Sequence, residues 1–185
     1  TVAVGMNTLA AQNFATSTDS YNTAVGYAAG TAVTTAINNT LIGGLAGDAI
    51  TTGASNTAVG AYAMTTMTTG ADNVAVGTSA LDVTTTGQQN VAVGRNALGT
   101  NVAASFQTAV GYNALATANY TTNIYAYNTA VGWYAGNSTT TGKITAVGAS
   151  VLQSNTTGIN NVAVGGATDA AGAALQNNTT GGHNT

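Results

Sequence analysis

A short motif recurs along the whole chain, and its spacing constrains the fold more than any other feature of the sequence. The motif reads NTAVG at residues 56–60 and NVAVG at residues 73–77 and 90–94. Its closing glycine recurs at Gly26, Gly43, Gly60, Gly77, Gly94, Gly111, Gly132, Gly148 and Gly165, and a shorter first copy ends at Gly5. Most of these glycines follow one another at 17 residues, two intervals are four residues longer and one is a residue shorter. Such regular self-similarity predicts an array of repeats.

The length of the period selects among the repeat folds. Helical repeats take roughly 33 residues or more and leucine-rich repeats roughly 20 or more, so 17 residues fit one coil of a β-solenoid. Side chains alternate along a strand, which places Val74 and Val76 on one face and Ala75 on the other. β-branched residues on one face favour a strand. Two glycines in each period, together with Val and Thr, disfavour an amphipathic helix.

Two further columns run through the aligned copies. An amide column holds Asn22, Asn39, Asn56, Asn73, Asn90, Asn128 and Asn161, with Gln107 as a substitute. A second glycine column holds Gly53, Gly70, Gly87, Gly142 and Gly158. We interpret both glycine columns as corners, where a positive φ or a close backbone approach needs glycine. We expect the amides to stack from coil to coil, which would satisfy polar groups inside the rod.

These patterns predict an all-β fold, a parallel β-solenoid or β-roll of about ten 17-residue coils. Residues 1–185 are then a single repeat array. If each coil rises by one strand spacing of about 4.8 Å, the rod is about 48 Å long.

Composition restricts the partners of such a rod. Only 4% of the residues are charged, and the net charge is -3. No basic patch predicts binding to nucleic acid or to an anionic membrane. No apolar run approaches the roughly 18 residues of a membrane-spanning helix, so we expect no membrane insertion. The chain has no cysteine, so disulfide pairing gives no information on its redox compartment.

No group of residues predicts catalysis, a cofactor or a metal site. His183 is the only histidine, Glu and Cys are absent, and Asp72 and Asp82 fall at different positions of the repeat. We therefore expect no ladder of aspartates, no repeated calcium site and no enzyme activity. Recurrent pairs such as Thr68-Thr69 suit an ice-binding face, but alternation leaves only one threonine of each pair on a given face.

Aromatic residues gather around the second four-residue insertion. Tyr120, Tyr125 and Tyr127 lie in or beside it, and Trp133 and Tyr134 follow the next motif glycine. Exposed aromatic side chains on a rod favour contact with a glycan or a receptor. The alternative is that these side chains pack between chains or cover a widened coil, and the sequence leaves both open.

The core N-[T/V/S]-A-[V/I]-G-x-x-A resembles the head repeats of trimeric autotransporter adhesins and the NTAVGYNAL-type repeats of phage tail fibres. The nearest copies are YNAL at residues 112–115, after Gly111, and RNAL at residues 95–98, after Gly94. The resemblance covers nearly the whole chain. It implies parallel β-rolls that pack three to a common axis, and hence a homotrimeric fibre.

From these features we expect a structural segment of an extracellular, cell-surface or virion fibre that provides reach and attachment. The sequence opens and closes inside a repeat, which leads us to expect a longer fibre or end-to-end stacking of subunits. The expected partners are further copies of the chain and a host-surface glycan or receptor. Two alternatives remain, a self-polymerising extracellular filament and an ice-binding solenoid.

Overall fold

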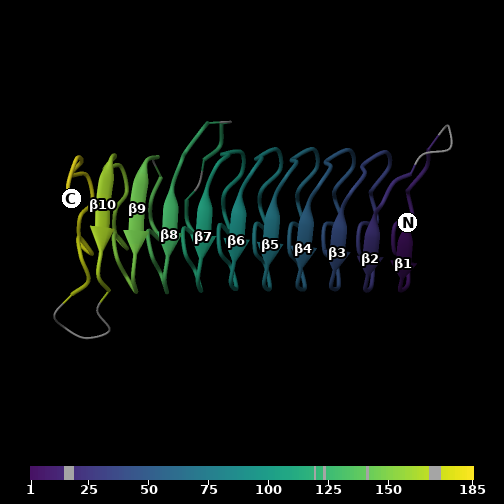
Figure 1. Cartoon of the computed structure of the whole chain (residues 1–185), viewed down its shortest axis with the longest axis horizontal. Helices are drawn as coiled ribbons and strands as arrows, with labels where there is room; N and C mark the ends of the chain where they lie inside the picture. Colours follow the sequence, from purple (N-terminus) through teal and green to yellow (C-terminus); the bar gives the residue numbers. More distant parts are fainter. Residues whose placement is uncertain (15–18, 119, 123, 141, 167–171) are drawn as a thin grey trace.

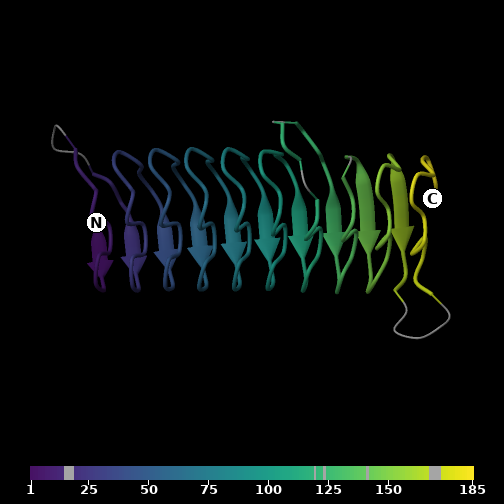
Figure 2. The same ribbon diagram turned by 180° about the vertical axis from the view of Figure 1, so that it is seen from behind.

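The structure is a rod of short parallel strands. A computed structural model describes residues 1–14, 19–118, 120–122, 124–140, 142–166 and 172–185. The strands are β1 Val2–Val4, β2 Thr23–Val25, β3 Thr40–Ile42, β4 Thr57–Val59, β5 Val74–Val76, β6 Val91–Val93, β7 Thr108–Val110, β8 Thr129–Val131, β9 Ile144–Val147 and β10 Asn161–Val164. They form one ten-stranded sheet in chain order, with the two termini at opposite ends of the rod (Figures 1 and 2). The predicted parallel β-solenoid is confirmed, with about nine turns and no helix among the described residues.

The register between neighbouring strands reproduces the repeat. In the pairing of β4 with β5, Ala58 lies opposite Ala75, and in the next pairing Ala75 lies opposite Ala92. The register is also kept across the first insertion, where Ala3 lies opposite Ala24. Equivalent residues of successive coils therefore lie above one another. A residue type that recurs in the sequence becomes a continuous column along the rod.

The interior of each coil is narrow, and small or medium side chains fill it. The middle residue of most strands is an alanine, and Ala58, Ala75 and Ala92 have no exposed surface. The alanine three residues after the motif glycine and the residue that follows it are also buried, as at Ala97 and Leu98. The sequence predicted two faces for each strand, and the structure places alanine inside and the β-branched residues outside.

The two glycine columns form corners at which successive backbones touch. At Gly60 φ is 139°, and an added Cβ would lie 2.6 Å from the carbonyl oxygen of Gly77 in the next coil. At Gly87 in the second column an added Cβ would lie 2.5 Å from the carbonyl oxygen of Ala104. Real Cβ atoms do not approach a carbonyl oxygen so closely, so the interpretation of both columns as close-approach corners agrees with the structure.

Three further positions of each coil adopt left-handed backbone angles, mostly without glycine. They are the second and fourth residues after the motif glycine and the residue before the amide column, as at Asn96 (φ 59°), Leu98 (φ 51°) and Gln89 (φ 55°). None of the non-glycine residues with positive φ in the described part of the chain is Val, Ile or Thr. β-branched side chains are strongly disfavoured in this region. The backbone therefore explains why the fourth position after the motif glycine holds leucine, methionine or glycine in the described coils and no β-branched residue.

The amide column forms a ladder inside the rod. The Oδ1 of Asn56 accepts a hydrogen bond from the backbone N–H of Asn73 (3.1 Å), and the Oδ1 of Asn73 accepts one from the backbone N–H of Asn90 (2.9 Å). The Nδ2 of Asn73 also donates to the carbonyl oxygen of Gly87 (2.9 Å) at the corner of the next coil. Each side chain thus ties its own strand to the following coil and satisfies buried polar groups.

The ladder changes at the second insertion. Gln107 takes the place of an asparagine, and Tyr120 enters the core beside it. The Nδ2 of Asn128 donates to the Oε1 of Gln107 (3.0 Å) and to the hydroxyl oxygen of Tyr120 (2.7 Å). The Nε2 of Gln107 is buried and has no hydrogen-bond partner among the described residues. This rung therefore leaves one buried donor unsatisfied.

Candidate functional site

Any binding site must use the open surfaces of the rod. No pocket indents the described part of the molecule. The described residues also contain no group of three or more His, Cys, Asp and Glu side chains placed to hold a metal ion. The expectation that the protein is not an enzyme stays a prediction from its sequence.

Two of the aspartates, Asp48 and Asp82, share one repeat position, although Asp72 and Asp82 do not. Asp48 and Asp82 each lie five residues after a motif glycine, and Thr65 occupies that position in the coil between them. Two strand spacings, about 9.6 Å, separate their coils. The two aspartates therefore do not stack on adjacent coils, and Thr65 interrupts the column between them.

Burial is the main influence on these two carboxyls. It raises the pKa of Asp48, whereas backbone hydrogen bonds at Asp48 and Ala49 lower that pKa and the charge of Asp82 raises it. Burial likewise raises the pKa of Asp82, and a side-chain hydrogen bond with Thr65 lowers it. The Oδ1 of Asp48 is buried without a hydrogen-bond partner in the described structure. Both carboxyls thus carry a desolvation cost when they ionise.

The Thr-Thr pairs are largely structural. The hydroxyl of Thr51 donates to the carbonyl oxygen of Thr68 (3.1 Å), and the hydroxyl of Thr68 donates to the carbonyl oxygen of Thr85 (3.2 Å). The second residues of the first two pairs, Thr52 and Thr69, are exposed. In these two pairs the half-buried hydroxyl of the first threonine bonds to the next coil, and the second threonine stays at the surface.

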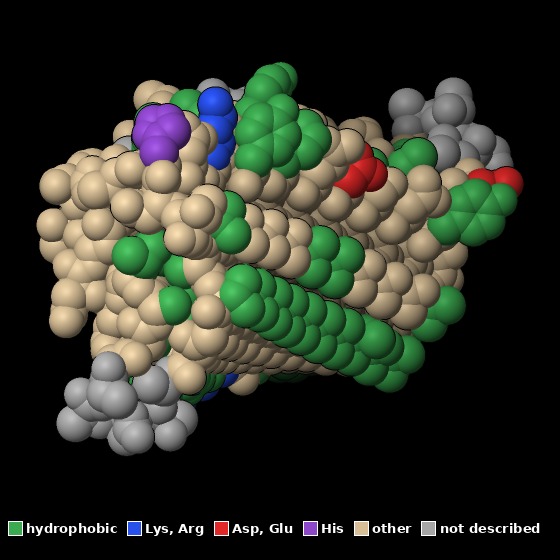
Figure 3. Space-filling model, turned by 60° about the vertical axis from the view of Figure 1, so that its left-hand side comes forward, with side chains coloured by type: hydrophobic (Ala, Val, Ile, Leu, Met, Phe, Trp, Pro, Cys, Tyr) green, Lys and Arg blue, Asp and Glu red, His purple; other side chains and the backbone are tan. Residues whose placement is uncertain are grey.

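The outer face of the sheet carries a continuous apolar column, which we call the valine stripe. It consists of the last residue of each strand: Val4, Val25, Ile42, Val59, Val76, Val93, Val110, Val131, Val147 and Val164. Figure 3 shows a band of hydrophobic side chains that runs along the rod. The neighbouring outward column holds only threonine and valine, so neither outward position of a strand carries a charge. A continuous exposed apolar surface of this kind indicates an interaction site.

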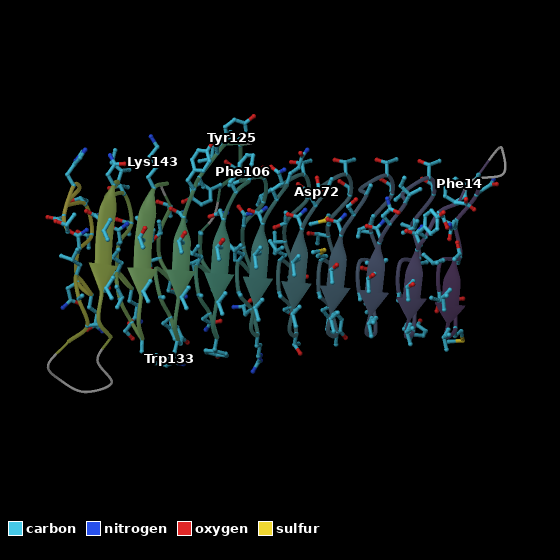
Figure 4. The ribbon with its side chains drawn as sticks, viewed as in Figure 1. Phe14, Asp72, Phe106, Tyr125, Trp133 and Lys143 are labelled. Carbon is cyan, nitrogen blue, oxygen red and sulfur yellow. The ribbon has the colours of Figure 1, made fainter. Side chains whose placement is uncertain are left out.

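The five aromatic residues predicted for surface contact do not form one surface. Tyr120 is only 4% exposed, so it belongs to the core and is not available for surface contact. Burial raises the pKa of Tyr120 to about 12, although the hydrogen bond from Asn128 acts in the opposite direction and lowers that pKa. Tyr125 lies at one edge of the rod and Trp133 at the opposite edge (Figure 4). The exposed residues therefore form two separate groups.

Tyr125 and Tyr127 form an exposed group with Phe106, which we call the aromatic cluster. The ring centroids of Phe106 and Tyr127 lie 5.4 Å apart with 24° between the planes, and Tyr125 meets Phe106 edge-on at 5.0 Å and 85°. The sequence prediction did not include Phe106. It lies directly before the amide column, at the same repeat position as Tyr127, so alignment of the coils could have identified it.

The second insertion builds this cluster. Ser105 pairs with Tyr125, whereas Thr108, three residues later, pairs with Thr129, four residues after Tyr125. One extra residue of the later coil therefore lies between the two pairings. The rings of Tyr125 and Tyr127 both contact the ring of Phe106 on the preceding coil. Such bulges often re-aim side chains beside functional sites.

The second aromatic group lies around Trp133. Its ring meets that of Tyr134 at 4.4 Å and 65°, and Tyr134 contacts Tyr112 at 5.6 Å. Trp133 is 54% exposed. Because Trp133 and Tyr125 lie at opposite edges of the rod (Figure 4), each group would meet a ligand independently.

Comparison with known proteins assigns no family to this chain. No family model, curated protein or solved structure matches it at a significant level. In the described part of the chain, no helix is long and apolar enough to cross a membrane.

Proposed function

We propose that the protein is a structural segment of an extracellular, cell-surface or virion fibre, in which three copies pack along their valine stripes. The stripe is the observation that supports this proposal. Five of its residues, Val4, Ile42, Val76, Val147 and Val164, are between 36% and 68% exposed. Each Å² of apolar surface removed from water contributes roughly 25 cal/mol. No charge on the outward strand positions opposes association.

A copy of the same chain is the partner that fits the stripe best. Two copies have the same spacing between coils, so the side chains of one stripe meet those of the other at every rung. Three rods around a common axis each bury their stripe once, and a closed symmetry of this kind stops sideways growth. The edges that carry aromatic residues stay outside such an interface. The assembly provides reach and attachment, in the manner of an adhesin or a tail fibre.

The two alternative functions, a self-polymerising filament and an ice-binding solenoid, differ in how the rods associate. A self-polymerising filament would grow end to end, and its length would rise with protein concentration. An ice-binding solenoid would act as a single rod and would show thermal hysteresis. The hydrogen bonds that Thr51 and Thr68 make to the next coil weigh against ice binding by these hydroxyls.

Two matched substitutions test the role of the stripe. Val76→Lys places a charge in the stripe, whereas Val83→Lys places one at a valine outside the strands, and both valines are 37% exposed. Sedimentation equilibrium should show a trimer for the unmodified protein and for Val83→Lys. Val76→Lys should dissociate to a monomer with an unchanged far-UV circular dichroism spectrum. A monomeric unmodified protein, or equal behaviour of the two variants, would contradict the proposal.

A further inference from the structure

We propose that the aromatic cluster binds a neutral polysaccharide through the C–H faces of its pyranose rings. This inference rests on the attachment role proposed above, and it names the chemistry of the attached partner. The site consists of Phe106, Tyr125 and Tyr127 with the polar side chains on the neighbouring rungs.

The rings of the cluster are open to solvent. Tyr125 is 64% exposed, Tyr127 54% and Phe106 37%. Tyr125 and Tyr127 meet at 62° with centroids 6.2 Å apart, so the cluster presents ring surfaces in two orientations. An aromatic face carries negative charge density. The axial C–H groups of a pyranose are weakly positive and apolar, and they complement such a face without any ionic group.

Polar side chains flank the rings along the same edge. Gln89 occupies the equivalent position one coil before Phe106, and Lys143 the position one coil after Tyr127. Both are exposed, and Figure 4 shows Lys143, Tyr125 and Phe106 along one edge of the rod. An amide and an ammonium group donate hydrogen bonds to sugar hydroxyls. The rungs are about 4.8 Å apart, close to the length of one sugar residue in an extended chain.

The residue type along this edge changes from coil to coil, unlike the interior columns. The equivalent positions hold Tyr21, Asn38, Ser55, Asp72, Gln89, Phe106, Tyr127, Lys143, Asn160 and His183, all with left-handed backbone angles. The same backbone therefore accepts polar, charged and aromatic side chains, so packing within the coil does not require the rings. Aromatic residues occupy two successive rungs of this edge only at Phe106 and Tyr127.

The open surface determines the kind of ligand. No pocket encloses the cluster among the described residues, so an extended polymer fits better than a small molecule that needs enclosure. Asp72 and Lys143 lie on either side of the cluster on the same edge, and their opposite charges favour a ligand without net charge. Binding at one cluster would be weak, and several clusters on one assembly would strengthen it through multivalency.

Saturation-transfer difference NMR with cellohexaose tests the inference, because each ring of this sugar has axial C–H groups on both faces. We expect transfer to the sugar ring protons from the unmodified protein, and at least tenfold less from the double variant Tyr125→Ala/Tyr127→Ala. Tyr21→Ala is the matched control, since Tyr21 has the same repeat position and is 69% exposed. It should bind as the unmodified protein does. Absence of transfer to both cellohexaose and chitohexaose, or full transfer in the double variant, would overturn the inference.

A second variant separates loss of the rings from loss of structure. Tyr125→Phe/Tyr127→Phe keeps the ring faces and removes only the hydroxyl groups, so it should retain transfer to the sugar. If this variant bound no sugar while its circular dichroism spectrum stayed unchanged, ring stacking would be the wrong mechanism. Sedimentation of the same samples separates the two proposals. A trimer that binds no sugar overturns only the glycan inference, and a monomer that binds sugar overturns only the trimer.

Discussion

Asn73 and Asn90 lie one above the other in successive coils, and two donors of Asn90 share one acceptor on Asn73. The backbone N–H of Asn90 donates to the Oδ1 of Asn73 at 2.9 Å, and the Nδ2 of Asn90 donates to the same atom at 3.1 Å. Both residues are fully buried. Because similar contacts recur along the rod, hydrogen bonds between coils supply cohesion that the narrow alanine interior cannot supply by packing alone.

Removal of one amide should therefore destabilise the rod markedly. Asn73→Ala removes the oxygen that accepts a hydrogen bond from the backbone N–H of Asn90. It also removes the amide that donates to the carbonyl oxygen of Gly87. A buried group left unsatisfied costs about 1–3 kcal/mol, so we expect the free energy of unfolding to fall by at least about 2 kcal/mol. Urea unfolding followed by circular dichroism measures this change. Gln88→Ala, at an exposed residue of the same region, is the control, and an equal effect of both variants would contradict the structural role of the ladder.

The left-handed position of Leu98 gives a prediction about side-chain shape. Leu98 is fully buried with φ 51°, and Met64 occupies the equivalent position with φ 57°. Leu98→Met should cost less than about 1.5 kcal/mol, as volume-conserving exchanges do. Leu98→Ile preserves volume but places a β-branched residue at positive φ, so it should cost about 1–2 kcal/mol more. Thermal and urea unfolding of the two variants would show the difference, and an isoleucine variant as stable as the methionine variant would speak against this backbone constraint.

Two glycines on neighbouring coils should differ in how well they tolerate alanine. Gly60 should not accept it, whereas Gly44 should. Gly60→Ala would place a Cβ 2.6 Å from the carbonyl oxygen of Gly77 at a φ of 139°, whereas a Cβ at Gly44 meets no atom within 4 Å. We expect Gly60→Ala to lose several kcal/mol of stability or to fail to fold. Gly44→Ala should stay within about 1 kcal/mol of the unmodified protein. Soluble yield and the urea midpoint distinguish the two, and similar values for both would show that the corner tolerates a side chain.

The buried Tyr120 should make the rod sensitive to alkaline pH. Its pKa is about 12 in the folded chain, and the ordinary value is 10.0. A raised folded pKa stabilises the protein fully below about pH 10, and this contribution is lost as the pH rises from about 10 to about 12. Absorbance near 295 nm should show a tyrosine ionisation centred near pH 12. In Tyr120→Phe that late step should be missing, and an unchanged titration curve would contradict the burial of Tyr120.

The period was sufficient to predict the parallel solenoid and its corners, because identical residues at a fixed spacing must stack. The sequence alternation of Ala75 with Val74 and Val76 did not decide which face is buried, since both faces are apolar. Left-handed positions were not predicted either, because Leu98 carries no local signal for a positive φ. Their signature is the avoidance of Val, Ile and Thr, which becomes visible only when all coils are compared.

The repeat period did not predict the burial or the contacts of the aromatic residues around the second insertion. Tyr120 and Tyr125 lie around an insertion that most coils lack, so their register could not be inferred from the regular 17-residue repeat. The structure buries Tyr120 and brings Tyr125 against Phe106. Phe106, in contrast, lies in a regular column and was identifiable in principle from its alignment with Tyr127.

Electron cryo-microscopy of the native assembly tests the central claim most directly. We expect three-fold symmetry about the long axis, with one solenoid per chain, rungs about 4.8 Å apart and the valine stripes facing the axis. Single rods, or rods joined only end to end with Val76 and Val93 exposed to solvent, would contradict a fibre built from three chains.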